Sequence, residues 1–302
     1  MWGREDENFR NLQKTRKNDY MDFADEIELT SDLEKALELE IILVAILVKG
    51  MQDLSEKIGK ALENSNKPKT FVLCMKGIDE EALEPLSKTL RRQLDKYNVK
   101  NAKICVWVGP GHTREFLAGK SGVMVIDGED PAKSQEIANM FTSPILKLYV
   151  GNDLLGAEIG AALKNVLGIA AGMLDGLDMA TLKGGLMARG LYEVSRLIVA
   201  MGGERLTPYG LSCLGDFEAT MFSQNSHNRM YGEWFVGRKV DEPHSAEGVS
   251  TARAVIKLAE RHDVRMRICN LVYQILYEGK DAKEGLTELF LNPSAGGEFP
   301  ST

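Results

Sequence analysis

The chain has 302 residues, of which 44% are hydrophobic and 27% charged, and its formal net charge is −7 at pH 7. A chain of this length can bury a large core and lies near the size at which single cores usually split into two domains. The negative balance provides no general basic field, so nucleic acid is disfavoured as a partner. An anionic substrate would therefore need cationic side chains gathered at its site.

The cysteines and the hydropathy of the chain argue against several further classes of protein. Four widely spaced cysteines form no CxxC pair, so the sequence suggests neither a metal site nor a disulfide framework, and a reducing compartment fits. The longest apolar run, Ile41 to Val48, is eight residues long and too short to span a bilayer. The N-terminus is charged from Arg4 onward, unlike a signal peptide. We expect a cytoplasmic protein without a membrane span.

The first half alternates short apolar runs with helical patterns, as parallel βαβ units do. Strands are expected at Ile41 to Val48, Thr70 to Met75, Ile104 to Val108, Gly122 to Ile126 and Ile145 to Val150. Helices are expected at Met51 to Glu63, Glu80 to Tyr97 and Pro131 to Phe141. Residues 1–150 therefore predict an α/β domain built on a parallel sheet.

The second half loses the Val/Ile runs and shows long helical periods instead. Helices are expected at Leu154 to Leu174, Leu182 to Met201, Tyr209 to Phe222, Ser250 to His262 and Arg267 to Glu278. We place the domain boundary near Gly151, so residues 151–302 should form an all-α domain. Its long apolar helices favour a homodimer.

One charged residue stands out within the expected helix that begins at Leu154. Lys164 is surrounded in sequence by Leu, Ile, Val, Ala and Gly, so its ammonium must be paired, reach water or lose affinity for its proton. A lysine that acts as a base near neutral pH needs a pKa of about 7 or 8 instead of about 10.4. Lys164 is thus a candidate acid/base group. A lysine at the edge of the apolar stripe, with its charge in water, fits this segment equally well.

Several long motifs follow one another along the chain. The helical half contains GAEIGAALKNVLGIAAGMLDGL, followed by MARGLYEVSRL, GLSCLGDFEATMFSQNSHNRMYG and EGVSTARAV, and the first half contains MWGRE, FVLCMKGID and VGPGHTREFLAGKSG. In sequence and order these motifs resemble those of NAD(P)-dependent glycerol-3-phosphate dehydrogenases: the glycine-rich start of the second domain and the segments after it, and upstream the second strand end, a later strand end and the loop beyond it. The resemblance spans nearly the whole chain. It implies a Rossmann-like dinucleotide-binding domain followed by a helical substrate domain.

The resemblance implies an oxidoreductase that interconverts sn-glycerol 3-phosphate and dihydroxyacetone phosphate with NAD or NADP, supplying glycerolipid synthesis. It makes Lys164 the general acid/base and Lys76 a lysine near the reacting carbon, at a strand end where α/β sheets bind ligands. A solvated strand-end lysine is the alternative for Lys76. The other substrate-binding residues implied are Asn165, Asp216, Thr220, His227, Asn228 and Arg229.

Two positions depart from the family pattern. His227 stands where the family usually has an arginine that binds phosphate, and an imidazole is only partly charged at neutral pH and cannot form a guanidinium's paired hydrogen bonds. Either Arg229 takes over, or phosphate binding is weaker and pH-dependent, or the substrate differs. An ordinary surface histidine is the alternative for His227 itself. In the loop after the third expected strand, Gly111 replaces a hydroxyl residue on the cofactor side, and Thr113 could partly replace it.

The cofactor-side residues implied by the resemblance are Arg4, Gly109, Thr113 and Glu247. An arginine after the second strand accommodates the 2'-phosphate of NADP, whereas an acidic residue there favours NAD. Because Glu5 adjoins Arg4, we expect use of either cofactor. For Glu247 the alternative is an acidic residue at a helix start, favoured by the helix dipole.

The GxGxxG turn that opens a dinucleotide-binding fold, with its first strand and helix, is absent from the sequence. Three hypotheses follow. The leading one is the dehydrogenase, with that segment omitted from the sequence. The second is a related oxidoreductase of another small phosphorylated alcohol. The third is a non-catalytic binding protein that has lost its glycine loop.

Overall fold

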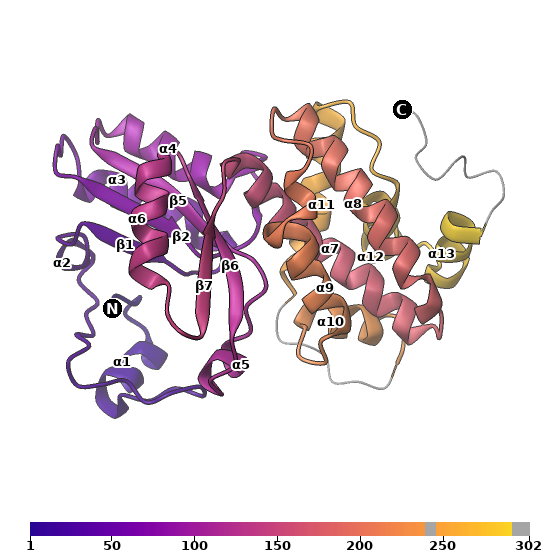
Figure 1. Cartoon of the computed structure of the whole chain (residues 1–302), viewed down its shortest axis with the longest axis horizontal. Coiled ribbons are helices and arrows are strands. Elements are labelled where there is room, and N and C mark those ends of the chain that lie inside the picture. The colour runs from indigo at the N-terminus through magenta and orange to yellow at the C-terminus, as the bar shows by residue number, and fades with distance from the viewer. Residues whose placement is uncertain (239–245, 292–302) are drawn as a thin grey trace.

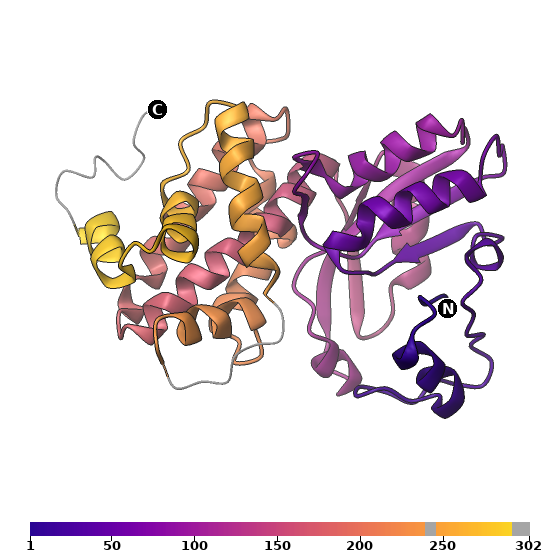
Figure 2. The ribbon, with the colours of Figure 1, turned by 180° about the vertical axis from the view of Figure 1, so that it is seen from behind.

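The computed structural model describes residues 1–238 and 246–291. It consists of a sheet flanked by helices and a helical bundle, which lie side by side in both views (Figures 1 and 2). The first residues of α7 (Leu154–Gly176) pass from the sheet into the bundle. The expected fold class, a Rossmann-like α/β domain with a helical domain behind it, is confirmed.

The main sheet has five strands in the order β1-β2-β5-β6-β7. They are β1 (Ile41–Val44), β2 (Lys69–Leu73), β5 (Ala102–Val108), β6 (Gly122–Gly128) and β7 (Leu146–Val150). β1, β2 and β5 run parallel, and β6 is parallel to β7. The β5–β6 pair is antiparallel, which corrects the expectation of a parallel sheet throughout. The link between them contains only the short α5 (Thr113–Leu117), whereas a parallel crossover needs a longer helical connection.

Helices cover both faces of this sheet (Figures 1 and 2). α3 (Met51–Ala61) and α4 (Leu86–Lys96) lie on one face, where their apolar sides pack on Phe71 and Ile104. α6 (Pro131–Phe141) lies on the other face against Val72. β2 is buried along its whole length because helices cover it from both sides, which explains why Phe71, Val72 and Leu73 follow one another without a polar residue between them.

Two expected elements in the sheet domain are shorter than predicted. The strand over 41–48 ends at Val44, and Val48–Gly50 forms a 3-10 turn, η1, that leads into α3. The helix expected from Glu80 begins only at Leu86, because β3 (Ile78–Asp79) pairs with β4 (Glu84–Pro85) in a two-stranded ribbon. An apolar run does not by itself determine where a strand stops.

The N-terminal segment lies beside the sheet and not within it (Figure 1). It contains α1 (Glu7–Thr15) and α2 (Leu33–Ala36), neither of which was expected. The residues expected to end a strand, Met1 to Glu5, contribute only an isolated bridge between Trp2 and Thr30. Among the described residues, β1 is therefore an edge strand of the main sheet, and the N-terminal segment adds no strand beside it.

The helical domain is built around α7, which is almost fully buried. By length and composition α7 could cross a membrane, but 89% of its apolar window is covered by the protein itself, so it is the central core helix. The surrounding elements are α8 (Lys183–Ala200), η4 (Leu211–Gly215), α9 (Asp216–Phe222), α10 (His227–Phe235), α11 (Glu247–Arg261), α12 (Arg267–Glu278) and α13 (Ala282–Leu291). α8, α11 and α12 match the expected helices closely.

The helix expected over 209–222 is interrupted. A 3-10 turn, η3 (Thr207–Tyr209), and the π-helical turn η4 precede α9, so the regular helix starts at Asp216. α10 and α13 were not expected. α10 packs closely on α7 because glycines face each other there: a β-carbon on Gly172 would overlap the carbonyl of Arg229, and one on Gly232 that of Ile169.

Candidate active site

A cavity of about 660 Å³ lies where the carboxyl ends of β2 and β5 face the helical domain. Its walls come from the loop after β2, from the loop that contains α5, from α7 and α9, and from the starts of α10 and α11. Ligands of open α/β sheets bind at this edge.

Lys164 projects from α7 into this cavity and is 7% exposed. Its Nζ donates to the hydroxyl of Thr220 at 2.8 Å and lies 3.3 Å from a carboxylate oxygen of Asp216. Burial lowers the pKa of Lys164, and the nearby charge of Lys76 acts in the same direction, while Asp216 opposes both. A buried amine whose pKa is lowered is a candidate acid/base group.

Lys76 reaches the same carboxylate from the sheet domain. Its Nζ donates to Asp216 Oδ2 at 2.5 Å and to the carbonyl of Gly109 at 3.1 Å. The carboxylate of Asp216 therefore lies between the two ammonium groups and is 6% exposed as a side chain. This is the arrangement that links the two domains at the cavity.

Amide side chains order the neighbouring wall. Asn228 donates to Asn165 at 3.0 Å and accepts from the backbone N–H of Gly248 at 2.9 Å. Asn165 in turn donates to Glu247 at 3.4 Å. Burial raises the pKa of Glu247, and the charges of Lys164 and Lys76 oppose that rise. These contacts fix which end of each amide faces the cavity.

The start of α10 forms the wall opposite α5. Ser226 caps the helix by accepting from the N–H of Arg229, and His227 and Asn228 line the cavity. His112, in the loop before α5, lies 3.3 Å from the hydroxyl of Ser223 and so joins the two domains at this end.

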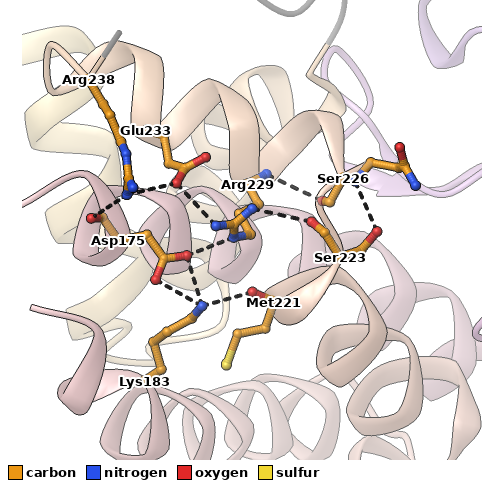
Figure 3. Close-up of polar contacts among 9 residues, drawn as sticks. Asp175, Lys183, Met221, Ser223, Ser226, Arg229, Glu233 and Arg238 are labelled. Atoms are coloured by element: carbon orange, nitrogen blue, oxygen red, sulfur yellow. Dashed lines mark hydrogen bonds and ion pairs between the residues drawn. The ribbon is translucent and has the colours of Figure 1, made fainter. Parts of the chain in front are cut away.

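Arg229 does not line the cavity, against the expectation that it contacts substrate. Its guanidinium donates to Asp175 at 2.7 Å and to Glu233 at 3.1 Å (Figure 3). Lys183 and Arg238 bind the same two carboxylates. Arg229 is thus committed to an ion-pair network between α7, α8 and α10.

The residues expected on the cofactor side do not all lie at the same place in the structure. Glu247 is shared between the cavity and a second hollow of about 500 Å³, formed by the turn before α3, the β3 region and the start of α11. Thr113 lines the cavity, and Gly109, at φ 125°, turns its carbonyl toward Lys76. Arg4 lies near Gly50 and lines neither hollow.

The second hollow adjoins the cavity at Glu247, the residue that lines both. Within residues 1–238 and 246–291, no glycine-rich turn between a strand and a helix precedes β1, so this part of the chain does not provide a cradle for the pyrophosphate.

The cavity-lining residues that sequence reasoning missed include Tyr20, His112 and Arg114. A signal for two of them was available. His112 and Arg114 follow β5, and loops after neighbouring parallel strands meet at one edge of a sheet. Tyr20 belongs to the irregular N-terminal segment, for which periodicity offers no guide.

Comparisons with known proteins agree with this site. Family models described as the N-terminus and the C-terminus of NAD-dependent glycerol-3-phosphate dehydrogenase match residues 1–134 and 153–287. The glycerol-3-phosphate dehydrogenase (NAD(P)+) of Fusobacterium nucleatum is 31% identical over 289 residues, covering 93% of this chain and 84% of the relative. That of Clostridium botulinum strain Alaska E43 is 34% identical over 275 residues, covering 88% and 80%.

A solved structure supports the fold. Glycerol-3-phosphate dehydrogenase from Coxiella burnetii superposes with a TM-score of 0.87 at 23% identity, covering 96% of this chain and 90% of that one. The resemblance drawn from the motifs is confirmed. The chain therefore belongs to the NAD-dependent glycerol-3-phosphate dehydrogenase family.

Proposed function

We propose that this protein interconverts sn-glycerol 3-phosphate and dihydroxyacetone phosphate with NAD or NADP, a reaction that supplies glycerolipid synthesis. The observation that carries this proposal is the pair of amines, Lys164 and Lys76, that meet over one cavity through Asp216. A secondary alcohol needs a base at its hydroxyl and a hydride acceptor over its carbon.

Lys164 moves the proton. In the oxidising direction its neutral amine accepts the hydroxyl proton, and in the reducing direction its ammonium returns that proton to the carbonyl oxygen. Burial lowers the pKa of Lys164 and so makes the neutral form accessible, while Asp216 at 3.3 Å keeps the ammonium form available. Thr220, which accepts from Nζ at 2.8 Å, holds the amine in position.

The other residues of the site bind and orient the substrate and the cofactor. Lys76 stabilises the substrate oxygen at the reacting carbon, and Asn165 and Asn228 present fixed amides to the substrate. His227, at the start of α10, faces the phosphate. When bound, NAD(P) supplies the hydride acceptor or donor. Glu247, Thr113 and Gly109 are assigned to the nicotinamide side, and Arg4 to the adenosine side.

We further propose that residues 1–150 hold the dinucleotide, that residues 151–302 hold the substrate, and that the enzyme works as a cytoplasmic homodimer. Tyr149 and Leu206, which are 53% and 77% exposed, line a surface cleft of mixed polar and apolar residues, and exposed apolar side chains favour association. Light scattering should give twice the chain mass, and Leu206→Asp should favour the monomer if this cleft is the interface.

Another small phosphorylated ketone is the alternative substrate. His227 and Gly111 favour it, because both line the cavity where the family pattern has other residues. Relative kcat/KM values for dihydroxyacetone phosphate and other small phosphorylated ketones decide between the two. A strong preference for another ketone would reject glycerol 3-phosphate as the substrate.

Loss of nicotinamide absorbance with dihydroxyacetone phosphate and NADH or NADPH tests the activity directly. Lys164→Ala should reduce kcat by about 100- to 10,000-fold, the usual contribution of general acid-base catalysis, with cofactor fluorescence titration unchanged. Lys257→Ala, an exposed lysine on α11, serves as control. Wild-type turnover in Lys164→Ala would remove the proton-transfer role.

A further inference from the structure

The cavity is lined by more cationic side chains than carboxylates. Three cationic side chains, those of Lys76, Lys164 and Arg114, face two carboxylates, those of Asp216 and Glu247. Both lysines are held by Asp216, at 2.5 Å and 3.3 Å. The excess positive charge of the cavity therefore comes from the arginine.

Arg114 differs from the other cations in having no partner. In residues 1–238 and 246–291, its guanidinium makes no ion pair or hydrogen bond, and the residue is exposed. The adjacent Glu115 lies 3.4 Å from Lys120 instead. Arg114 is also the one arginine among the described residues that line the cavity, because Arg229 is turned into the network with Asp175. An unpaired guanidinium at a cavity wall can receive an anion.

The facing wall suits the same anion. α10 begins at His227, and the first N–H groups of a helix lack intrahelical acceptors and carry partial positive charge. Asn228 follows in the first turn and also lines the cavity. The contact of His112 with Ser223 at 3.3 Å brings the α5 loop to this end of the helical domain.

We propose that Arg114 binds the substrate's phosphate from the sheet side, opposite the start of α10. This inference rests on the proposed function. In it, Arg114 supplies the guanidinium for the phosphate that His227, an imidazole, does not. A dianion between Arg114 and α10 contacts both domains at once, so the phosphate also holds them together around the reacting carbon. Arg114 takes no part in proton transfer.

Kinetics separate phosphate binding from chemistry. Arg114→Gln should raise KM for dihydroxyacetone phosphate by about 10- to 100-fold, the usual effect of a lost charged hydrogen bond. It should leave kcat/KM for dihydroxyacetone, which lacks the phosphate, within about twofold of wild type. Arg114→Lys, which keeps the charge but not the planar fork, should give an intermediate KM. Lys120→Gln, in the same loop but outside the cavity wall, should match wild type.

A second measurement does not depend on turnover. Inorganic phosphate should raise the melting temperature of the wild-type protein, and Arg114→Gln should need about tenfold more phosphate for the same shift. Equal KM values and equal phosphate titrations for wild type and Arg114→Gln would overturn the assignment while the proposed function stands. If the wild type does not reduce dihydroxyacetone phosphate with either cofactor, the proposed function fails, and the phosphate titration alone then decides the role of Arg114.

Discussion

Asp216 and Lys76 are 140 positions apart in the chain, yet Oδ2 of Asp216 accepts a hydrogen bond from Nζ of Lys76 at 2.5 Å. The same carboxylate lies 3.3 Å from Nζ of Lys164. A residue of the helical domain therefore sets the electrostatics of both amines, one from each domain. Like charges this close disfavour each other, so the intervening carboxylate is what allows two ammonium groups to share one cavity.

Asp216→Asn should lower the pKa of Lys164 further, because it removes the larger of the two carboxylate charges that favour protonation. The charge of Glu247 remains, while burial and Lys76 still oppose protonation. The alkaline limb of kcat/KM for ketone reduction should therefore move to lower pH. The exposed Asp178→Asn is the matched control. An unshifted limb would mean that Lys164 is not the acid seen in the pH profile.

Gly172→Ala should destabilise the protein by about 3 kcal/mol or more, since its β-carbon would overlap the carbonyl of Arg229 where α7 crosses α10. Gly184→Ala makes the same change within α8, where no atom lies within 4 Å. That control should be neutral or more stable by up to about 1 kcal/mol. Urea unfolding of both variants measures the difference, and equal stabilities would contradict the close helix crossing.

Asp175→Asn should cost about 3–5 kcal/mol of unfolding free energy, because it leaves the buried cation of Lys183 without its carboxylate and Arg229 with Glu233 alone. Asp53→Asn breaks an ion pair of 2.8 Å with Lys57, both side chains being more than half exposed, and should cost at most about 0.5 kcal/mol. A small loss in Asp175→Asn would show that the network in Figure 3 contributes little to stability.

Glu158 should make stability fall as pH rises. Burial raises its pKa from 4.5 to about 7, although Ser87 donates to both carboxylate oxygens. The folded state then binds more protons than the unfolded state between these two values, so the free energy of unfolding decreases across that window.

Glu158→Gln should remove this dependence. The unfolding free energy of the variant minus that of wild type should rise by on the order of 2 kcal/mol from pH 5 to pH 8. This is less than the full pKa shift would give at about 1.4 kcal/mol per pKa unit. The exposed Glu260→Gln should show no such gain. Parallel stability curves for wild type and Glu158→Gln would contradict the raised pKa.

Regular elements with a strong period could be predicted from the sequence. The helices over 131–141 and 267–278 begin and end where they were expected, and Asp130 before Pro131 is a recognisable start signal. The helix expected from Glu80 and the single helix over 209–222 were wrong at their beginnings. A two-stranded ribbon and a π-helical turn replace the first turns there, and neither has a hydrophobic period.

Composition and local pattern alone determined that this chain has a sheet half and a helical half, and that one lysine lies in an apolar helix. They did so because burial imposes a period on neighbouring residues. Which cations face the cavity was decided only by the tertiary structure. The sequence does not distinguish the roles of Arg229 and Arg114. In the structure Arg229 is paired with Asp175, whereas Arg114 lines the cavity. Ion pairs form between residues that are distant in the chain, so no local pattern records them.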